Sequence, residues 1–127
     1  MAKTPESDEQ KKVIAWVRYH EDSIVALRTL YHPAGSYFGM GFGVIRWLQL
    51  LGVRKGVWDL HLPLDNGAWS GLWIEMKGPK GKLTAEQINF RDNIQQSTYK
   101  SSLFVVCHTA EDAIKAIKEY LRTGETL

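Results

Sequence analysis

A hairpin pattern in the middle of the chain constrains its fold more than any other feature. Two strand-forming segments, residues 57–64 and 69–77, flank the turn signal Asp65-Asn66-Gly67-Ala68. Asn and Gly both tolerate positive φ, which a tight hairpin turn requires, so the sequence predicts that the two segments pair as antiparallel strands. The rest of the chain must then build its core around this pair.

The second strand of the hairpin places an acid and a base on one face. Side chains at i and i+2 of a strand leave the same face, so Glu75 and Lys77 point together. Pairing of the strands brings Asp59 beside Glu75. Two carboxylates are the oxygen ligands that a hard divalent cation prefers, and a lysine beside them stands next to the reacting atoms. The pattern predicts a Mg²⁺-dependent phosphodiesterase site, and the alternative is a salt bridge on a strand surface.

Four helices are predicted outside the hairpin, over residues 4–20, 44–51, 84–98 and 111–122. The first starts either at Thr4-Pro5 or at a capping box from Ser7 to Gln10. The second ends at Gly52, and the third starts at the capping box Thr84-Ala85-Glu86-Gln87. The last carries apolar residues on one face.

Two further strands are predicted, over Ile24–Tyr31 and Leu103–Cys107. Proline ends the first at His32-Pro33, and the wholly apolar second suits a central, buried position. Cys107 is therefore expected to be a buried structural thiol rather than a nucleophile. The resulting order, αβ(α)ββαβα, is that of an α/β fold with a mixed central sheet flanked by helices.

Composition limits the kinds of protein that this chain can be. Its 127 residues, 44% hydrophobic and 24% charged, fit one globular domain over residues 1–127. No run approaches the roughly 20 apolar residues of a membrane span, and no signal-peptide core follows the first residues, so an intracellular protein is expected. A net charge of +2 permits nucleic-acid binding without indicating it unaided.

The strand motif also carries a resemblance to known nucleases. Asp59 followed by Glu75-Met76-Lys77 resembles the D…(D/E)-x-K signature of the PD-(D/E)XK nuclease superfamily. More narrowly, the chain resembles the VRR-NUC family in its small, stand-alone, virus- or phage-type form. The segments that carry this resemblance are Lys55–Leu60, Trp73–Lys77, Gly81–Thr84 and Glu86-Gln87. One departure is that the family usually has proline directly before the aspartate, where this chain has Trp58.

The resemblance implies a restriction-endonuclease-like core and a role for each polar residue of the motif. Asp59 and Glu75 would bind Mg²⁺ or Mn²⁺, and the backbone carbonyl of Met76 would add a neutral ligand. Lys77 would lower the pKa of the attacking water, orient it, or neutralise charge on the phosphate, and the sequence does not choose among these roles. Trp58 in place of proline affects local backbone geometry more than metal binding.

Two further catalytic candidates lie on the predicted helices. Family members place a glutamate of the first helix at the metal site, and Glu9, on a stripe with Val13 and Trp16, is assigned this role as a metal ligand. The alternative is that this first-turn acid only complements the helix dipole. Gln87 either contacts the site, as the resemblance suggests, or serves only its capping box.

Basic residues near the motif are candidates to bind a nucleic-acid backbone. Lys80 and Lys82 lie in a glycine-containing loop whose amides also suit a phosphate, and Arg54 and Lys55 precede the first hairpin strand. Further candidates of the same kind are Arg46, Arg91 and Lys100. The alternative for each is a solvated surface charge.

The aromatic residues near the motif each allow a structural role or a contact with a ligand. His61 shares the face of Asp59, where a hydrogen-bonded structural role is favoured over a ligand contact. The five tryptophans lie mostly in apolar runs and are expected in the core, although Trp58 or Trp69, if exposed, would be able to stack on a base.

The predicted function is that of a metal-dependent, structure-directed DNA endonuclease, because no base-reading helix is evident. The resemblance points to branched or flapped DNA in repair, recombination or viral replication, and above all to four-way (Holliday) junctions. Alternatives are a flap nuclease, a catalytically silent DNA-binding module, an RNA-directed phosphodiesterase and a restriction-like enzyme. The enzyme would act in the cytoplasm of its own cell or, if virus-encoded, of a host.

A homodimer is expected, because resolving a four-way junction requires two cuts in strands of like polarity, which a two-fold dimer supplies by symmetry. Tyr37–Phe42 and Val44–Leu51 carry more apolar groups than one small domain need bury. These two segments are the predicted interface.

Overall fold

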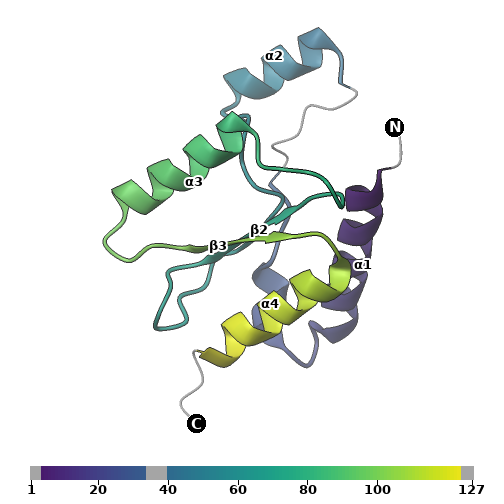
Figure 1. The fold of residues 1–127 in the computed structure, drawn as a ribbon, viewed down its shortest axis with the longest axis vertical. Helices are drawn as coiled ribbons and strands as arrows, with labels where there is room; N and C mark the ends of the chain where they lie inside the picture. The colour runs from purple at the N-terminus through teal and green to yellow at the C-terminus, as the bar shows by residue number, and fades with distance from the viewer. Residues whose placement is uncertain (1–3, 34–39, 124–127) are drawn as a thin grey trace.

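The structure, a computed structural model, describes residues 4–33 and 40–123 (Figure 1). Its helices are α1 (Pro5–His20), the 3₁₀ helix η1 (Val25–Thr29), α2 (Phe42–Leu50), α3 (Ala85–Ser97) and α4 (Ala110–Thr123). Its strands are β1 (Leu60–Leu62), β2 (Leu72–Met76) and β3 (Leu103–Cys107). Within the described ranges, every helix is too short or too polar to serve as a membrane span.

The predicted hairpin is the centre of the fold. β1 and β2 pair antiparallel with Leu60 opposite Ile74, and β3 joins the other edge of β2 in parallel. Among the described residues the sheet has three strands in the order β1-β2-β3, and the prediction of a mixed sheet flanked by helices is confirmed (Figure 1). Both hairpin strands are shorter than the sequence indicated.

The turn of the hairpin is held by the side chain of Asn66. Gly67 has a φ of +93°, whereas Asn66 does not adopt positive φ. The Asn66 carboxamide oxygen accepts hydrogen bonds from the amides of Ala68 (3.0 Å) and Trp69 (2.7 Å), and its nitrogen donates to the Tyr120 carbonyl (3.0 Å). This buried side chain therefore ties the turn to α4.

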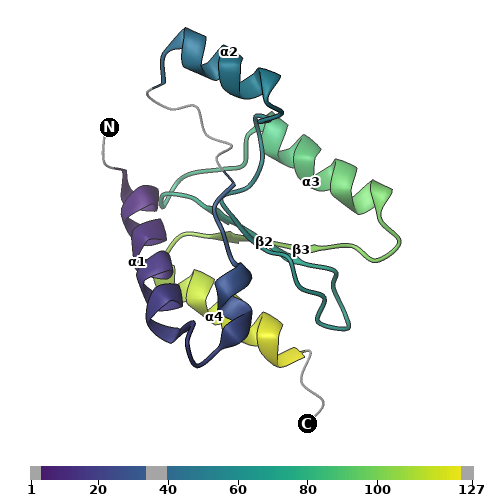
Figure 2. The same ribbon diagram turned by 180° about the vertical axis from the view of Figure 1, so that it is seen from behind.

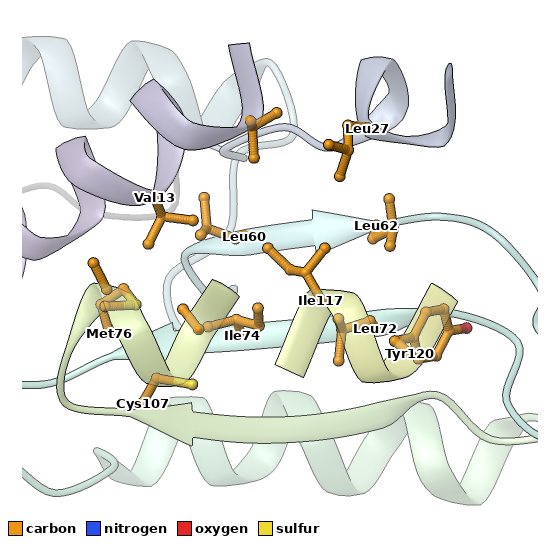
Figure 3. Packing of buried hydrophobic residues seen from close by; sticks show 13 residues of the cluster. Val13, Leu27, Leu60, Leu62, Leu72, Ile74, Met76, Cys107, Ile117 and Tyr120 are labelled. Carbon is orange, nitrogen blue, oxygen red and sulfur yellow. The ribbon is translucent and has the colours of Figure 1, made fainter. Parts of the chain in front are cut away.

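The sheet lies between two layers of helices (Figures 1 and 2). One face packs against α1, η1 and α4, where apolar residues of β1 and β2 meet Val13, Leu27 and Ile117 (Figure 3). α3 covers the opposite face, where the rings of Phe90 and Trp73 meet edge-on with centroids 4.9 Å apart. Because side chains alternate along a strand, Leu72, Ile74 and Met76 of β2 enter the core, while Trp73 and Glu75 face α3.

Two helix starts follow the capping signals of the sequence. The Thr4 hydroxyl accepts a hydrogen bond from the Ser7 amide (3.2 Å), so α1 starts at the earlier of the two signals and not at the box from Ser7 to Gln10. Thr84 caps α3 in the same way, through the Gln87 amide (3.2 Å).

The predicted strand over Ile24–Tyr31 is wrong. The segment forms η1, and the strand-like pairing in this described segment is an isolated antiparallel bridge between Tyr31 and His61. The β preference of these residues is overridden because the 3₁₀ turn buries Leu27 completely in the core. The first strand of the predicted order is thereby reduced to one bridge.

β3 is an edge strand of the described sheet, not the central strand that its apolar sequence suggested. β2 takes the central position, and all of its residues are buried. On β3, Val106 is exposed, whereas Cys107 is buried as predicted. Burial raises the pKa of the Cys107 thiol to about 11, which keeps it protonated at neutral pH. The apolar sequence of β3 therefore reflects contacts on both faces of the strand and not a central position in the sheet.

α2 stands apart from the sheet, at one end of the molecule beyond the first turn of α3 (Figures 1 and 2). The predicted helix exists, but none of its residues is buried. Phe42 is 86% exposed, Trp47 59% and Leu50 74%, so its apolar groups lie in solvent. Part of the predicted interface, residues 37–39, lies outside the described residues.

Candidate active site

Asp59 exchanges two hydrogen bonds with Glu75 and Met76 at the end of β2. The Asp59 amide donates to Glu75 Oε1 (3.1 Å), and the Met76 amide donates to Asp59 Oδ2 (2.9 Å). These bonds continue the β1–β2 ladder one step past Leu60 and Ile74, with carboxylates in place of backbone carbonyls. The hairpin register therefore brings the two predicted carboxylates together.

Glu75 Oε2 is shared by two nitrogen donors. Lys77 Nζ lies 3.5 Å away, and Gln87 Nε2 donates a hydrogen bond of 2.7 Å from the first turn of α3. Gln87 also completes the capping box, because its Oε1 accepts from the Thr84 amide (2.9 Å). Both interpretations of Gln87, capping and contact with the site, therefore hold at once.

Burial makes this carboxylate pair difficult to ionise. Glu75 is only 4% exposed. Burial, followed by the nearby charge of Asp59, raises the pKa of Glu75 to about 8, and burial also raises the pKa of Asp59. The Lys77 ammonium and the hydrogen-bond donors lower both pKa values without cancelling the effect of burial.

This donor set fits a hard divalent cation. Two buried carboxylates that repel each other are stabilised by a double positive charge, and Mg²⁺ and Mn²⁺ prefer such oxygen ligands. In the part of the chain that the structure describes, His, Cys, Asp and Glu side chains form no group of three or more that would hold an ion. Met76 contributes its amide to Asp59, and the metal role of its carbonyl stays a prediction.

The two acids Glu6 and Glu9 of α1 have different surroundings. Glu9, the predicted metal ligand, accepts a hydrogen bond from the Ala110 amide at the start of α4 (3.0 Å) and pairs with Lys12 Nζ (2.7 Å); both contacts lower its pKa. Glu6 lies beside the loop that follows β2, with Oε2 only 3.2 Å from where a Cβ would stand on Gly78. The metal role of Glu9 stays a prediction, and Glu6 becomes a second candidate for it.

Glu6 lines an open hollow of about 630 Å³ that also reaches Lys77. The loop 78–82 forms its remaining wall, and both views place this loop beside the first turn of α1 (Figures 1 and 2). Lys80 and Lys82 are exposed in this loop. Several cations around an open hollow suit a phosphate group, and contact of these lysines with nucleic acid stays a prediction.

The remaining basic candidates are spread over the surface. Arg46 and Arg54 are exposed. Three others form surface ion pairs: Lys55 with Glu86 (3.4 Å), Arg91 with Asp92 (3.1 Å) and Lys100 with Asp65 (3.0 Å). The pair formed by Lys100 lies at the hairpin turn, at the opposite end of β1 from Asp59, so Lys100 is poorly placed to hold a phosphate at the site.

The sequence did not single out His32, which neighbours Asp59. His32 Nδ1 lies 2.6 Å from the Asp59 carbonyl oxygen, and Gln10 Nε2 of α1 lies 3.3 Å from the same nitrogen. These contacts join segments far apart in the chain, and no periodic pattern leads to them. Glu6, by contrast, falls seven residues before the buried Val13, so the helical stripe through Val13 and Val17 would have found it.

The aromatic candidates near the site are structural. Trp58 is 1% exposed and Trp69 packs half-buried against the core, in agreement with the expectation that the tryptophans lie mostly in the core, so the Trp58 ring is not available to stack on a base. His61 stacks on Trp73 with centroids 3.8 Å apart, and its Nδ1 lies 3.0 Å from the Tyr31 hydroxyl. Burial lowers the pKa of His61 to about 4, so the ring is neutral at physiological pH.

The raised pKa of Glu75 predicts how stability depends on pH without divalent cations. The Glu75 carboxyl ionises near pH 4.5 in the unfolded chain and only at about pH 8 in the folded protein. Its protonated form therefore favours folding fully below about pH 4.5, and this contribution is lost as the pH rises to about 8. Urea unfolding in chelator should show a free energy of unfolding that falls over this interval.

Glu75→Gln is the control for this experiment, because the amide keeps the shape of the side chain and cannot ionise. The fall in stability that is due to Glu75 should be absent in this variant, and added Mg²⁺ should reduce the fall in the unmodified protein alone. The same pH dependence in both proteins would contradict the shifted pKa.

Comparison with known proteins agrees with this fold. A solved structure described as "VRR_NUC domain protein" has the same fold, with a TM-score of 0.73 and 19% sequence identity over 98% of this chain and 94% of that chain. No curated protein matches the sequence. The family model of the VRR-NUC domain matches residues 43–111, which is more than half of the chain. The chain therefore belongs to the VRR-NUC domain family.

Proposed function

We propose that this chain is a Mg²⁺- or Mn²⁺-dependent, structure-directed DNA endonuclease whose preferred substrate is branched DNA such as the four-way junction. The family implies a nuclease-type function with DNA as the partner. The observation that carries the proposal is the joined pair Asp59 and Glu75, with Lys77 Nζ 3.5 Å from Glu75. Two carboxylates held together in a buried place, with raised pKa values, are typical of a functional site.

Each residue has a chemical task in this proposal. Asp59 and Glu75 hold the cation, which supplies a Lewis acid for the phosphate and lowers the pKa of a water. Lys77 orients the attacking water or neutralises charge that develops on the phosphate. Gln87 keeps Glu75 Oε2 in place through its hydrogen bond of 2.7 Å.

In this proposal, basic residues around the hollow and before the Asp59 strand contact the DNA backbone. Lys80 and Lys82 line it, and Arg54 and Lys55 precede the strand that carries Asp59. Phosphate contacts of this kind position a duplex without selecting a sequence. Substrate choice then depends on the shape of the DNA, which suits a role in repair, recombination or viral replication inside a cell.

The first test is cleavage of end-labelled duplex, flap, splayed-arm and four-way-junction DNA, and of RNA, with Mg²⁺, Mn²⁺ or chelator. Asp59→Ala and Glu75→Ala should abolish cleavage, because each removes a ligand carboxylate. Lys77→Ala should still bind Mn²⁺ in calorimetry while turnover falls by on the order of 10²-fold, as for loss of an electrostatic stabiliser.

Lys100→Ala is the matched control, because it removes a lysine at the far end of the hairpin, and it should cleave normally. Undiminished cleavage by Lys77→Ala would refute the site. Cleavage confined to flaps or to RNA would show that this substrate, and not the four-way junction, is the preferred one. Metal binding without any cleavage would identify a catalytically silent DNA-binding module.

A second test compares the two acids of α1. Glu6→Gln and Glu9→Gln each remove one charge and keep the shape of the side chain. We expect Glu6→Gln to weaken Mn²⁺ binding more, because Glu9 is engaged by Lys12 and by the Ala110 amide. Glu9→Gln should mainly lower the melting temperature, because Glu9 accepts a hydrogen bond from the Ala110 amide at the start of α4. A greater loss of Mn²⁺ affinity from Glu9→Gln would instead support the predicted role of Glu9 as the metal ligand.

We also propose that the protein acts as a homodimer through α2. Its exposed residues include Phe42, Val44, Trp47 and Leu50, an apolar surface that a second copy would cover. A two-fold dimer presents two active sites to one junction, as paired cuts require.

Light scattering should give twice the chain mass of 14.5 kDa, and Phe42→Glu or Trp47→Glu should shift the protein toward monomer. Gln49→Glu adds the same charge at an exposed position of α2 and serves as the control. Junction cutting should be lost in the monomeric variants before any flap cutting. A monomer that still makes paired, symmetric cuts would rule out this arrangement.

A further inference from the structure

Trp58, which stands where the family usually has proline, makes a specific contact with α3. Its Nε1 donates a hydrogen bond of 3.0 Å to the backbone carbonyl of Gln87. The indole is 1% exposed and meets Phe104 edge-on, with ring centroids 5.0 Å apart. Proline has no side-chain donor, so this link between the Asp59 strand and α3 depends on the residue found here.

Gln87, whose backbone carbonyl accepts from Trp58, also contacts Glu75 through its side chain. Its side-chain oxygen accepts from the Thr84 amide, which leaves the nitrogen to donate to Glu75 Oε2 at 2.7 Å. The amide is therefore held in one orientation by the start of α3. The position of the first turn of α3 therefore decides whether Gln87 Nε2 is close enough to donate to the Glu75 carboxylate.

The residues before Trp58 hold the same turn of α3. Gly56 has a φ of +94°, and a Cβ placed on it would lie 2.5 Å from the carbonyl oxygen of Glu86. Lys55 Nζ lies 3.4 Å from the Glu86 carboxylate. The segment 55–58 therefore contacts the first turn of α3 along its length, and Asp59 follows it directly in the chain.

We propose that Trp58 is a positioning residue: through the Gln87 carbonyl it sets the first turn of α3 so that the Gln87 amide holds Glu75 Oε2. This inference rests on the proposed function for its catalytic consequence. A fixed Oε2 keeps the carboxylate of Glu75 in one orientation for a cation, as partners of ligand carboxylates do in metal sites. Asp59 and Glu75 are then each held by a fixed N–H donor.

The alternative is that the Trp58 ring only fills space beside Phe104. Trp58→Phe separates the two roles, because it keeps an aromatic ring and removes the N–H. Trp73→Phe is the matched control: it also reduces a buried indole, one that packs on Phe90, His61 and Phe104. Both variants change packing on Phe104, whereas Trp58→Phe also removes the hydrogen bond to the Gln87 carbonyl.

The first readout is the side-chain amide of Gln87 in ¹⁵N spectra of the metal-free protein. In the unmodified protein and in Trp73→Phe this amide should be shifted and slow to exchange, and in Trp58→Phe it should move to the position of a free amide. An unchanged Gln87 amide in Trp58→Phe would overturn the proposal. This readout needs no catalysis, so it stands even if the nuclease function fails.

The second readout is a double-mutant cycle on Mn²⁺ affinity measured by calorimetry. Trp58→Phe should weaken binding by about three- to tenfold, near the lower end of what loss of a partner to a metal ligand causes. The variant Trp58→Phe with Gln87→Met should bind no more weakly than Gln87→Met alone, because Trp58 acts through Gln87. Additive losses would show that Trp58 acts by packing only.

A third measurement covers the case in which Trp58→Phe does not fold. In the unmodified protein, the indole N–H resonance of Trp58 should shift on addition of Mg²⁺, whereas that of Trp73 should stay in place. A Trp58 resonance that ignores Mg²⁺ while the Glu75 resonances respond would overturn the coupling. Failure of every resonance to respond would refute the metal site of the proposed function, and the Gln87 exchange rate would still decide the positioning role.

Discussion

The reciprocal hydrogen bonds between Asp59 and the end of β2 are the interaction on which the site depends. They replace the next backbone pair of the β1–β2 ladder, so the register of the hairpin and the approach of the two carboxylates are one and the same feature. Two buried acids side by side are unstable as charges, and backbone amides offset only part of this, as the raised pKa of Glu75 shows. The proposed divalent cation would offset this cost of ionising the pair.

Local signals in the sequence were enough to predict this part of the fold. The alternation of β2 sends Ile74 and Met76 into the core and leaves Glu75 with Lys77 on the other face, a pattern of period two that needs no tertiary information. The capping box from Thr84 to Gln87 likewise fixes the start of α3. Because the box and the contact with Glu75 use different atoms of Gln87, a purely local motif also places a residue of the site.

The parts that could not be predicted depend on contacts between distant segments. Ile24–Tyr31 has the composition of a strand, but burial of Leu27 under α1 makes it a 3₁₀ turn. His32 meets Asp59 across 27 positions of the chain, and Trp58 reaches Gln87 across 29. Glu6 and Glu9 both lie near the helical stripe of the buried valines, so their spacing alone does not decide which of them would bind a metal.

α2 has few contacts that would stabilise it within the fold described above. A helix of 9 residues is marginal by itself in water, and this one has neither a buried residue nor a side-chain cap. Its sequence is nevertheless apolar on several sides, with Phe42, Trp47 and Leu50 all exposed. Surface of this kind is stabilised when it is covered, so the stability of α2 and the assembly of the protein should rise and fall together. Hydrogen exchange of the α2 amides should then slow with increasing protein concentration, while exchange in β2 stays constant.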